Sequence, residues 1–272
     1  MRVRVLGSAA GGGFPQWNCR CGTCEAARAG VRARPRTQSS LAIRSSQGPW
    51  WLVNASPDLR QQLETLDREG DAVRAAPIAG VLLTDAEIDH TAGLLLLRES
   101  TTPLRVFGAA GIEHVLRGTL LKLLERFCGV EWTVLQPGRP TALDGLVVEP
   151  FEVGEATGFV FRDDATVTYV PALARLDDAV LARFAASDLV LVDGTFWTAD
   201  ELPRLGFTQR TAHDMGHVPL SDSLDTLAGL RARTVLVHIN NTNPILLEDS
   251  PEREQVVRAG VEVAYDGLEV EL

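Results

Sequence analysis

The sequence contains no apolar run long enough to span a membrane. A transmembrane helix needs about 20 consecutive apolar residues, and no segment of the 272 residues approaches that length. The N-terminus also lacks the basic and apolar regions of a secretory signal, because Met1 to Val5 leads directly into a strand-like segment. We therefore expect a protein that has no membrane segment and is located in the cytoplasm.

Lysine is scarce as well, and nearly all positive charge comes from arginine. Lys122 is the only lysine, and the formal net charge is −10. A protein that binds nucleic acid needs a basic surface to neutralise the phosphates. The composition therefore argues against a nucleic-acid partner.

Cysteine is rare, but three of the four cysteines are clustered. Cys19, Cys21 and Cys24 form a C-x-C-x-x-C pattern, and thiols in the cytoplasm stay reduced. Three thiolates so close in sequence can converge on one tetrahedral zinc ion. We predict a structural zinc site that takes its fourth ligand from elsewhere in the chain. Three unligated thiols are the alternative, and Cys128 is interpreted as a small buried hydrophobic residue.

Short strands and helices alternate along the chain. The expected strands are Val3–Gly7, Leu41–Arg44, Trp50–Asn54, Gly80–Thr84, Leu104–Phe107, Leu146–Glu149, Gly158–Phe161, Thr166–Val170, Leu189–Asp193, Thr234–Ile239, Val261–Tyr265 and Leu268–Leu272. The expected helices are Ile112–Phe127, whose apolar residues form one stripe, Asp177–Ala186 and Ser221–Arg231.

We expect one α/β domain over residues 1–272, with two β-rich halves at roughly 1–145 and 146–272. Helices outside two such halves suggest a four-layered αββα sandwich. The polar stretch Arg32–Ser40 is the best candidate for a mobile loop. Composition alone does not choose the sandwich over other α/β folds.

Acidic residues and a histidine follow one of the predicted strands. The segment contains Asp85, Glu87, Asp89 and His90. A metal site at the end of a strand would use such side chains. The alternative is helix capping, because Thr84 and Glu87 have the spacing of a capping box. Capping does not require Asp89 followed by His90, so both interpretations stay open.

Three further segments place polar side chains at or near strand ends. His238 lies at the exit of one apolar strand and Asp193 at the exit of another, while His213 and His217 lie four residues apart on a loop. A lone histidine is more often a core residue than a ligand, so each observation is weak alone. Together they favour one site at the end of the sandwich.

At this point the sequence resembles a known family, protein B of pyrroloquinoline quinone (PQQ) biosynthesis, within the metallo-β-lactamase superfamily. The resemblance covers nearly the whole chain. It rests on the segments Gly7–Cys19, Asn54–Arg60, Ile88–Leu95, Asp193–Trp197, Met215–Pro219 and His238–Ile245. It implies a metallo-β-lactamase-like αββα sandwich.

The resemblance also reveals departures from the hydrolases of the superfamily. Their H-x-H-x-D-H motif corresponds here to Asp85, Glu87, Asp89 and His90, so two imidazoles have become carboxylates. No histidine stands near residues 152–155, and no bridging aspartate near residues 169–171. These losses weaken the case for a two-zinc hydrolase. Two histidines with carboxylates are instead typical of a 2-His-1-carboxylate iron site.

The resemblance implies the following roles. The active-site metal would be bound by His90, His238 and Asp89, and Asp85 or Glu87 would be a further ligand or proton acceptor. Asp193 and His217 would line the same cleft and support the ligands or transfer protons. Arg98 either clamps a substrate carboxylate or simply pairs with Glu99 on the surface. For the cysteine-bound zinc, the candidate fourth ligands are Asn241, His217, His213 or a water molecule.

The function implied by the resemblance is an Fe(II)- and oxygen-dependent hydroxylase of a tyrosine-derived, Glu-Tyr-like quinone precursor. Zinc is expected to substitute for iron in purified protein, because it binds nitrogen and oxygen ligands more tightly. Two alternatives stay open: a non-catalytic carrier of PQQ or its precursor, and a metal-dependent hydrolase of phosphodiester or lactone bonds. The expected partner is a small-molecule or peptide-derived quinone precursor, and the chain is also expected to pair as a homodimer.

Overall fold

Seven strands form the first sheet of the computed structural model, which describes residues 1–67 and 73–272. Their order is β14-β1-β2-β3-β4-β5-β6. The strands are β1 (Arg2–Gly7), β2 (Ser40–Arg44), β3 (Trp50–Val53), β4 (Ile78–Leu82), β5 (Leu104–Gly108), β6 (Val130–Val134) and β14 (Glu269–Glu271). From β3 to β6 all neighbours run parallel.

The second sheet also has seven strands, in the order β13-β12-β11-β10-β9-β8-β7. They are β7 (Thr141–Leu143), β8 (Leu146–Val153), β9 (Ala156–Arg162), β10 (Thr166–Val170), β11 (Leu189–Asp193), β12 (Arg233–Val237) and β13 (Glu262–Val263). Strands β10 to β13 run parallel. Because β7 already belongs to this sheet, the boundary between the halves falls a few residues before 145.

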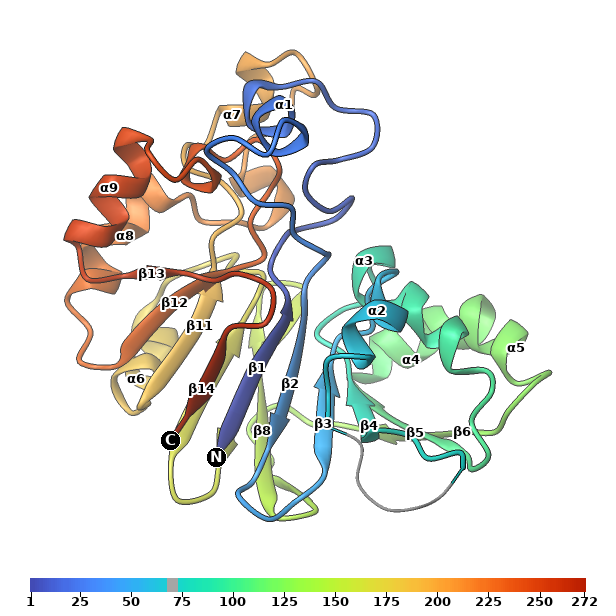
Figure 1. The fold of residues 1–272 in the computed structure, drawn as a ribbon. Coiled ribbons are helices and arrows are strands. Elements are labelled where there is room, and N and C mark those ends of the chain that lie inside the picture. The colour runs from blue at the N-terminus through green and yellow to red at the C-terminus, as the bar shows by residue number, and fades with distance from the viewer. Residues whose placement is uncertain (68–72) are drawn as a thin grey trace.

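The last strand departs from the two-half scheme. Strand β14 leaves the second sheet and pairs antiparallel with β1, so both chain ends lie side by side (Figure 1). The amino group of Met1 donates to the carbonyl of Leu272 over 2.6 Å. This closing strand ties the two halves together.

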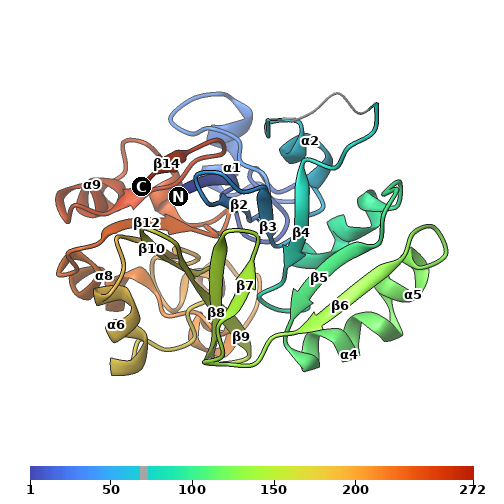
Figure 2. The ribbon, with the colours of Figure 1, turned by 90° about the horizontal axis from the view of Figure 1, so that it is seen from below.

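Helices cover the outer faces of both sheets (Figures 1 and 2). The helices are α1 (Gly22–Arg28), α2 (Leu59–Leu63), α3 (Ile88–Thr91), η1 (Ala92–Leu97), α4 (Ala110–Gly118), α5 (Leu120–Leu124), α6 (Asp178–Ala185), α7 (Glu201–Arg204), η2 (His213–Met215), α8 (Leu220–Ala228), η3 (Pro244–Leu246) and α9 (Pro251–Arg258). None in the described part of the chain combines the length and apolar character needed to cross a lipid bilayer.

Three apolar clusters separate the layers. One lies between the two sheets and joins Val5 and Leu41 to Tyr169 and Leu191. A second lies between the first sheet and α4 and α5, and a third between the second sheet and α6, α8 and α9. Alternation along the strands assigns side chains to opposite faces of each sheet. The expected αββα order of layers is therefore confirmed.

The single helix predicted over Ile112–Phe127 is wrong. The chain breaks at Thr119, whose φ of −130° and ψ of −96° are not helical, and gives two short helices. Gly118 and Thr119 are poor helix formers, which explains where the break falls. Ile112 is buried as predicted, but Phe127 at the other end of the stripe is 58% exposed.

The stretch Arg32–Ser40, predicted as a mobile loop, forms no helix or strand before β2 begins at Ser40, and its mobility stays a prediction. The backbone amide of Phe14 donates to the carbonyl of Arg36, and the amide of Arg36 donates back to the carbonyl of Phe14. Gln38 forms a parallel bridge with Ala9. The stretch is therefore held against the glycine-rich segment, through backbone pairing that polar composition does not reveal.

Candidate metal centre

Three histidines from distant segments meet beyond the ends of the central strands. His90 belongs to α3, which follows β4; His238 follows β12; and His217 lies after η2. The ring centroids of His90 and His238 are 5.1 Å apart, and those of His217 and His238 are 5.6 Å apart. The predicted convergence of these side chains at one end of the sandwich is confirmed.

Asp85 holds the His90 ring in one orientation. Its two carboxylate oxygens lie 2.8 and 2.7 Å from Nδ1 of His90, so Nδ1 carries the proton and donates. The other ring nitrogen, Nε2, is buried and has no hydrogen-bond partner among the described residues. Buried polar atoms are normally satisfied, and a free Nε2 opposite a carboxylate-bound Nδ1 is the usual state of a metal-binding histidine. This nitrogen fits a metal ion.

His238 takes its direction from an unusual backbone conformation. Its φ is +54°, in the left-handed region that non-glycine residues rarely adopt, and this turns the side chain at the exit of β12. Nε2 of His238 lies 3.5 Å from Oδ2 of Asp89, and Nε2 of His90 lies 3.7 Å from the same oxygen. Ligand atoms of Asp89, His90 and His238 all lie within 4.8 Å of one another. These three residues have the spacing that one shared metal ion requires.

Asp89 is itself closely packed. Gly11 lies so close to Asp89 that a side chain at this position would begin 3.2 Å from Oδ2 of Asp89. The glycine-rich segment therefore packs against this carboxylate. Burial alone would raise the pKa of Asp89, but the neighbouring ring of His238 and the charge of His90 bring its pKa below the usual range. The carboxylate is therefore ionised, as a metal ligand must be.

A second group uses His238 again. Asp193, His217 and His238 also have ligand atoms within 4.8 Å of one another. Nδ1 of His217 donates to Oδ2 of Asp193 over 2.6 Å. No aspartate stands near residues 169–171, where the superfamily pattern places a bridging aspartate. Asp193, at the end of β11, supplies the carboxylate of this second group. His217, expected as a supporting or proton-transferring residue, also has the spacing of a ligand.

In this structure Asp193 accepts four hydrogen bonds. The amide of Leu173 and the ring of His217 donate to Oδ2, and the amide and hydroxyl of Thr195 donate to Oδ1. Four donors occupy the roughly four lone-pair positions of a carboxylate. So bonded, Asp193 orients the ring of His217 and the side chain of Thr195.

The charges of the site follow from these pairs. Burial opposes the charged form of His90, but the carboxylates of Asp85 and Asp89 raise its pKa to about 9. Likewise burial lowers the pKa of His217, while Asp193 raises it, with a net upward shift. Without metal, the centre is a compact set of ion pairs, and a cation that binds there replaces protons on these rings.

Two predicted site residues do not join the centre. Glu87 is exposed; its amide donates to Asp85, and its carboxylate adds only the last and smallest of the charge effects on His90. The guanidinium of Arg98 pairs with Glu99 over 3.2 Å and lies over the ring of Phe127. The structure supports the surface interpretation of Arg98, because neither contact belongs to the metal centre.

The three clustered cysteines converge. Sγ atoms of Cys19, Cys21 and Cys24 lie within 4.8 Å of one another and form no disulfide. The side-chain amide of Asn241 points at Sγ of Cys24 over 3.3 Å and at Sγ of Cys21 over 3.7 Å. Among the proposed fourth ligands, Asn241 is therefore the one at the cluster, since His213 pairs with Asp222. Burial raises the pKa of Cys24 to about 11.

Sequence reasoning missed the residues that support the ligands. Thr195 contacts both Asp193 and His238, and the carboxamide of Asn54 is bonded to Thr84 beside Asp85. One signal was available for Thr195, because it stands two residues after an aspartate at a strand end. No local signal distinguished Thr84 from a helix cap.

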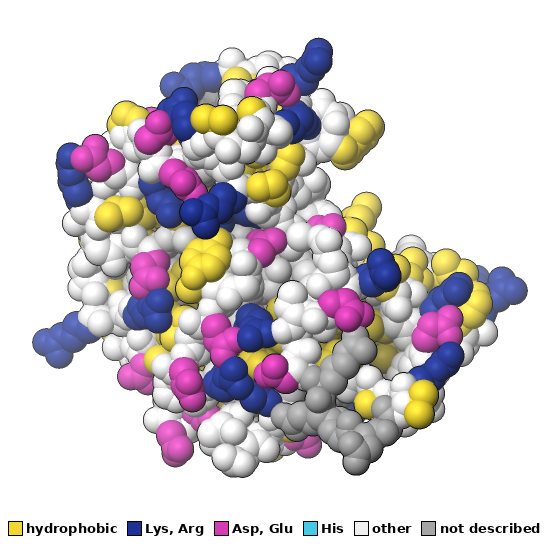
Figure 3. Space-filling model, in the orientation of Figure 1, with side chains coloured by type: hydrophobic (Ala, Val, Ile, Leu, Met, Phe, Trp, Pro, Cys, Tyr) yellow, Lys and Arg dark blue, Asp and Glu magenta, His cyan; other side chains and the backbone are white. Residues whose placement is uncertain are grey.

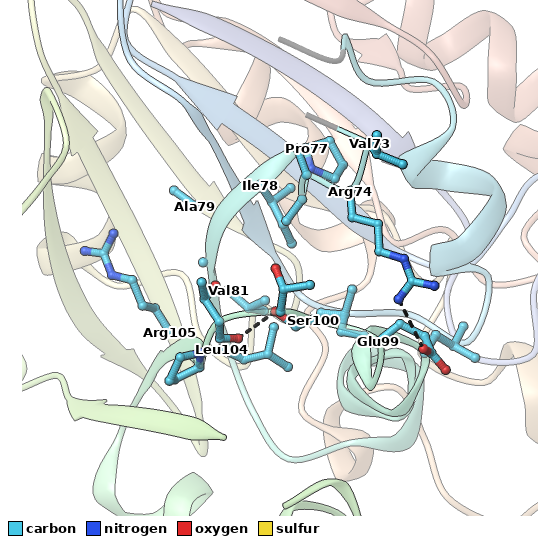
Figure 4. A pocket seen from close by; sticks show the side chains of 18 residues that line it. Val73, Arg74, Pro77, Ile78, Ala79, Val81, Glu99, Ser100, Leu104 and Arg105 are labelled. Atoms are coloured by element: carbon cyan, nitrogen blue, oxygen red, sulfur yellow. Dashed lines mark hydrogen bonds and ion pairs between the residues drawn. The ribbon is translucent and has the colours of Figure 1, made fainter. Parts of the chain in front are cut away.

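One cavity of the molecule lies away from the metal centre. A cavity of about 420 Å³ is lined by β4, the end of η1 and the start of β5 (Figure 4), and none of its described lining residues belongs to the metal centre. The surface is also notched between the part that carries α1 and α7 and the part that carries α3, with apolar side chains on both edges (Figure 3).

Comparison with known proteins agrees with this geometry. Residues 49–239 match the model of the beta-lactamase superfamily domain. Coenzyme PQQ synthesis protein B from Cupriavidus necator is 44% identical, with 99% of each chain covered. The protein of the same name from Methylococcus capsulatus is 42% identical over the full length of both chains. The chain belongs to the coenzyme PQQ synthesis protein B family.

A solved structure of this family gives the same fold. Zinc-bound PqqB from Methylobacterium extorquens superposes with a TM-score of 0.92 at 37% identity, and the match covers all of both chains. A diphosphatase of the PhnP family reaches a TM-score of 0.77 at 22% identity, with 100% of this chain and 98% of that chain covered. The second likeness supports the fold alone. Both the family resemblance and the metallo-β-lactamase fold are confirmed.

Proposed function

We propose that this member of the PQQ synthesis protein B family is an iron- and oxygen-dependent hydroxylase of a tyrosine-derived quinone precursor. The observation that carries the proposal is the grouping of Nε2 of His90, Nε2 of His238 and the carboxylate of Asp89. Two imidazoles and one carboxylate are the ligand set of non-haem Fe(II) oxygenases. Bound iron would supply the activation of dioxygen.

The residues of the chain hold and support this set. Asp85 and Thr195 fix the rings of His90 and His238, so the ligand geometry exists before the metal binds. His217, tied to Asp193, would accept or donate the proton that moves when the substrate hydroxyl reacts, because its other nitrogen is not held by that carboxylate.

The precursor class is supported by the family and by the surface. The relatives are named for the synthesis of coenzyme PQQ, a quinone, and the notch beside α3 has apolar edges that suit an aromatic ring. Ile88, the first residue of α3, is 75% exposed next to Asp89. In the reaction one oxygen atom of O₂ replaces a ring C–H bond with C–OH. The other oxygen leaves as water, so a two-electron reductant such as ascorbate is required.

The test is turnover by defined metal forms. Protein loaded with Fe(II) under anaerobic conditions is mixed with a Glu-Tyr dipeptide and ascorbate, and oxygen is then admitted. We expect a product heavier than the dipeptide by one oxygen atom, detected by mass spectrometry. His238→Ala should abolish the product, whereas His213→Ala, an exposed histidine outside the centre, should not.

Two outcomes would overturn the proposal. Equal turnover by the metal-free, zinc and iron forms would exclude an iron oxygenase. Tight binding of PQQ without turnover of any form would favour the carrier function instead. Zinc bound at the histidines of purified protein does not bear on the choice, because zinc outcompetes Fe(II) at nitrogen and oxygen ligands.

The second group of ligands favours one other candidate, a metal-dependent hydrolase. Such an enzyme needs two metal ions, and Asp193 and His217 would add ligands for a second ion beside the first group. Metal analysis distinguishes the two functions: a hydrolase should retain two zinc ions at the histidines, and an oxygenase one Fe(II). In either case we propose a separate zinc ion held by Cys19, Cys21 and Cys24, with Asn241 beside it.

A further inference from the structure

Thr195 lies at the centre of the hydrogen bonds that surround His238. Its hydroxyl oxygen is 2.5 Å from Oδ1 of Asp193, 2.9 Å from Nδ1 of His238 and 2.8 Å from the carbonyl oxygen of His238. Its carbonyl accepts from the amide of Asn240. Thr195 is buried, so water does not compete for these contacts.

The hydroxyl has one proton for these three neighbours. The shortest contact is with Oδ1 of Asp193, whose carboxylate also accepts from the amides of Leu173 and Thr195 and from the ring of His217. Two oxygens at 2.5 Å repel each other unless a proton lies between them, so Thr195 donates to Asp193. Its oxygen is then an acceptor toward Nδ1 of His238.

This direction of donation sets the state of the His238 ring. A proton must lie on Nδ1 for the contact of 2.9 Å with Thr195 to be favourable. A neutral imidazole carries only one proton, so Nε2 is left with a free lone pair facing Asp89. The carboxylate of Asp193 therefore orients the His238 ring indirectly, through the hydroxyl of Thr195 that lies between them. In contrast, Asp85 contacts His90 without an intermediary.

We propose that Thr195 is a positioning residue that selects the His238 tautomer and holds the turn after β12, so that Nε2 is presented to the metal. The inference rests on the metal-binding part of the proposed function and not on hydroxylation. It predicts that the hydroxyl, and not the size of the side chain, matters. Thr195→Ser should behave like the original protein, and the nearly isosteric Thr195→Val should not.

Cobalt(II) titration is the first measurement. Cobalt at thiolates gives intense sulfur-to-metal charge-transfer absorption, whereas cobalt at imidazole and carboxylate gives only weak visible bands, so the two sites are read separately. We expect Thr195→Val to weaken cobalt binding at the histidines by roughly 10- to 100-fold, the usual effect of removing a partner of a metal-binding histidine. Binding at the cysteines should be unchanged.

The matched controls are two other buried threonines. Thr168→Val removes a hydroxyl that is bonded to Ser187 in the same sheet and should leave cobalt binding unchanged. Thr84→Val removes a hydroxyl that lies 3.4 Å from Nδ1 of His90. It should change binding by only a few-fold, because Asp85 still holds that ring.

Tautomers are read directly by ¹⁵N NMR of histidine-labelled, metal-free protein. We expect the Nδ1–H form of His238 in the original protein and in Thr195→Ser, and a shift toward the Nε2–H form in Thr195→Val. If Thr195→Val does not fold, the original protein still decides the question, because an Nε2–H tautomer there overturns the proposal. Cobalt affinity of folded Thr195→Val equal to that of the original protein overturns it too. Neither result depends on whether the iron form hydroxylates a tyrosyl peptide.

Discussion

The two sheets contribute to the metal centre in different ways. The first sheet supplies a continuous segment: Asp85, Asp89 and His90 lie in the stretch 85–90 that follows β4, and the carboxylate of Asp85 contacts His90 directly. The second sheet supplies separate residues. Asp193 is the last residue of β11 and His238 follows β12, and the hydroxyl of Thr195 contacts both side chains.

The difference shows which half depends on distant support. His90 is held by Asp85, five residues earlier in the chain, in the loop between β4 and the short helix α3. His238 has a left-handed backbone, and the turn that follows it is fixed by Ser8, Thr195 and, at residue 242, Glu201. We therefore expect the second half of the site to be the more sensitive to changes made outside it.

The largest expected effect separates the two imidazole ligands. His238→Ala removes a ligand from both groups and should abolish metal binding at the histidines. His90→Ala leaves Asp193, His217 and His238 in place and should retain a weakly bound metal ion. Metal analysis after anaerobic loading measures the difference. Equal losses in the two variants would show that the groups do not share His238.

The next largest effect distinguishes the two carboxylates that orient the histidine rings, Asp193 and Asp85. Asp193→Asn disturbs both His217 and, through Thr195, His238, whereas Asp85→Asn disturbs His90 alone. We expect the loss of cobalt affinity at the histidines to be roughly 100-fold for Asp193→Asn and roughly 10-fold for Asp85→Asn. The opposite order in a cobalt titration would contradict the proposed dependence on distant support.

Loss of the zinc ion bound by the cysteines should affect only the half of the metal centre that contains His238. Cys21→Ser should release close to one zinc ion per chain and lower the melting temperature by several degrees, because structural zinc contributes to folding stability. Asn241 lies against Cys24 and only three residues after His238. The ¹⁵N resonances of His238 should therefore shift, while those of His90 should not. Shifts of equal size at both rings would argue against this path.

The smallest effect is a pH dependence at Glu201. Burial raises the pKa of Glu201 to about 7 from 4.5. Because the folded-state pKa is above the unfolded value, the stabilising effect of the neutral acid is complete below about pH 4.5 and is lost as the pH rises through 7. The melting temperature of Glu201→Gln relative to the original protein should rise by a few degrees between pH 5 and pH 8. A difference that does not change with pH would show that the carboxyl group does not titrate there.

The parts of the site that sequence could predict are those encoded locally. Asp85, Asp89 and His90 were visible because they follow one apolar strand, and the cysteines because three of them are close together. The helix over residues 112–127 was predicted wrongly because apolar periodicity ignores the weak helix formers at its middle. Thr195 was missed because its position two residues after an aspartate at a strand end does not reveal that its hydroxyl lies between a carboxylate and an imidazole. That arrangement depends on two parallel strands in register.

The αββα layers were predictable for a similar reason. Short apolar strands such as Leu189–Asp193 set the sheets, and alternating burial set the faces. The return of β14 to the first sheet was not predictable, because its three residues carry no pattern that distinguishes one edge strand from another. The same holds for β6, a strand whose residues are mostly exposed.

The central claim is that His90 and His238 bind one metal ion through Nε2, with Asp89 as the third ligand. The direct test is anomalous X-ray diffraction at the iron edge from crystals loaded with Fe(II) without oxygen. The account predicts an iron peak about 2.1 Å from Nε2 of both histidines, a typical metal–imidazole distance, and in contact with a carboxylate oxygen of Asp89. An iron peak bound to Nδ1 of either ring, or to His90 without His238, would contradict it.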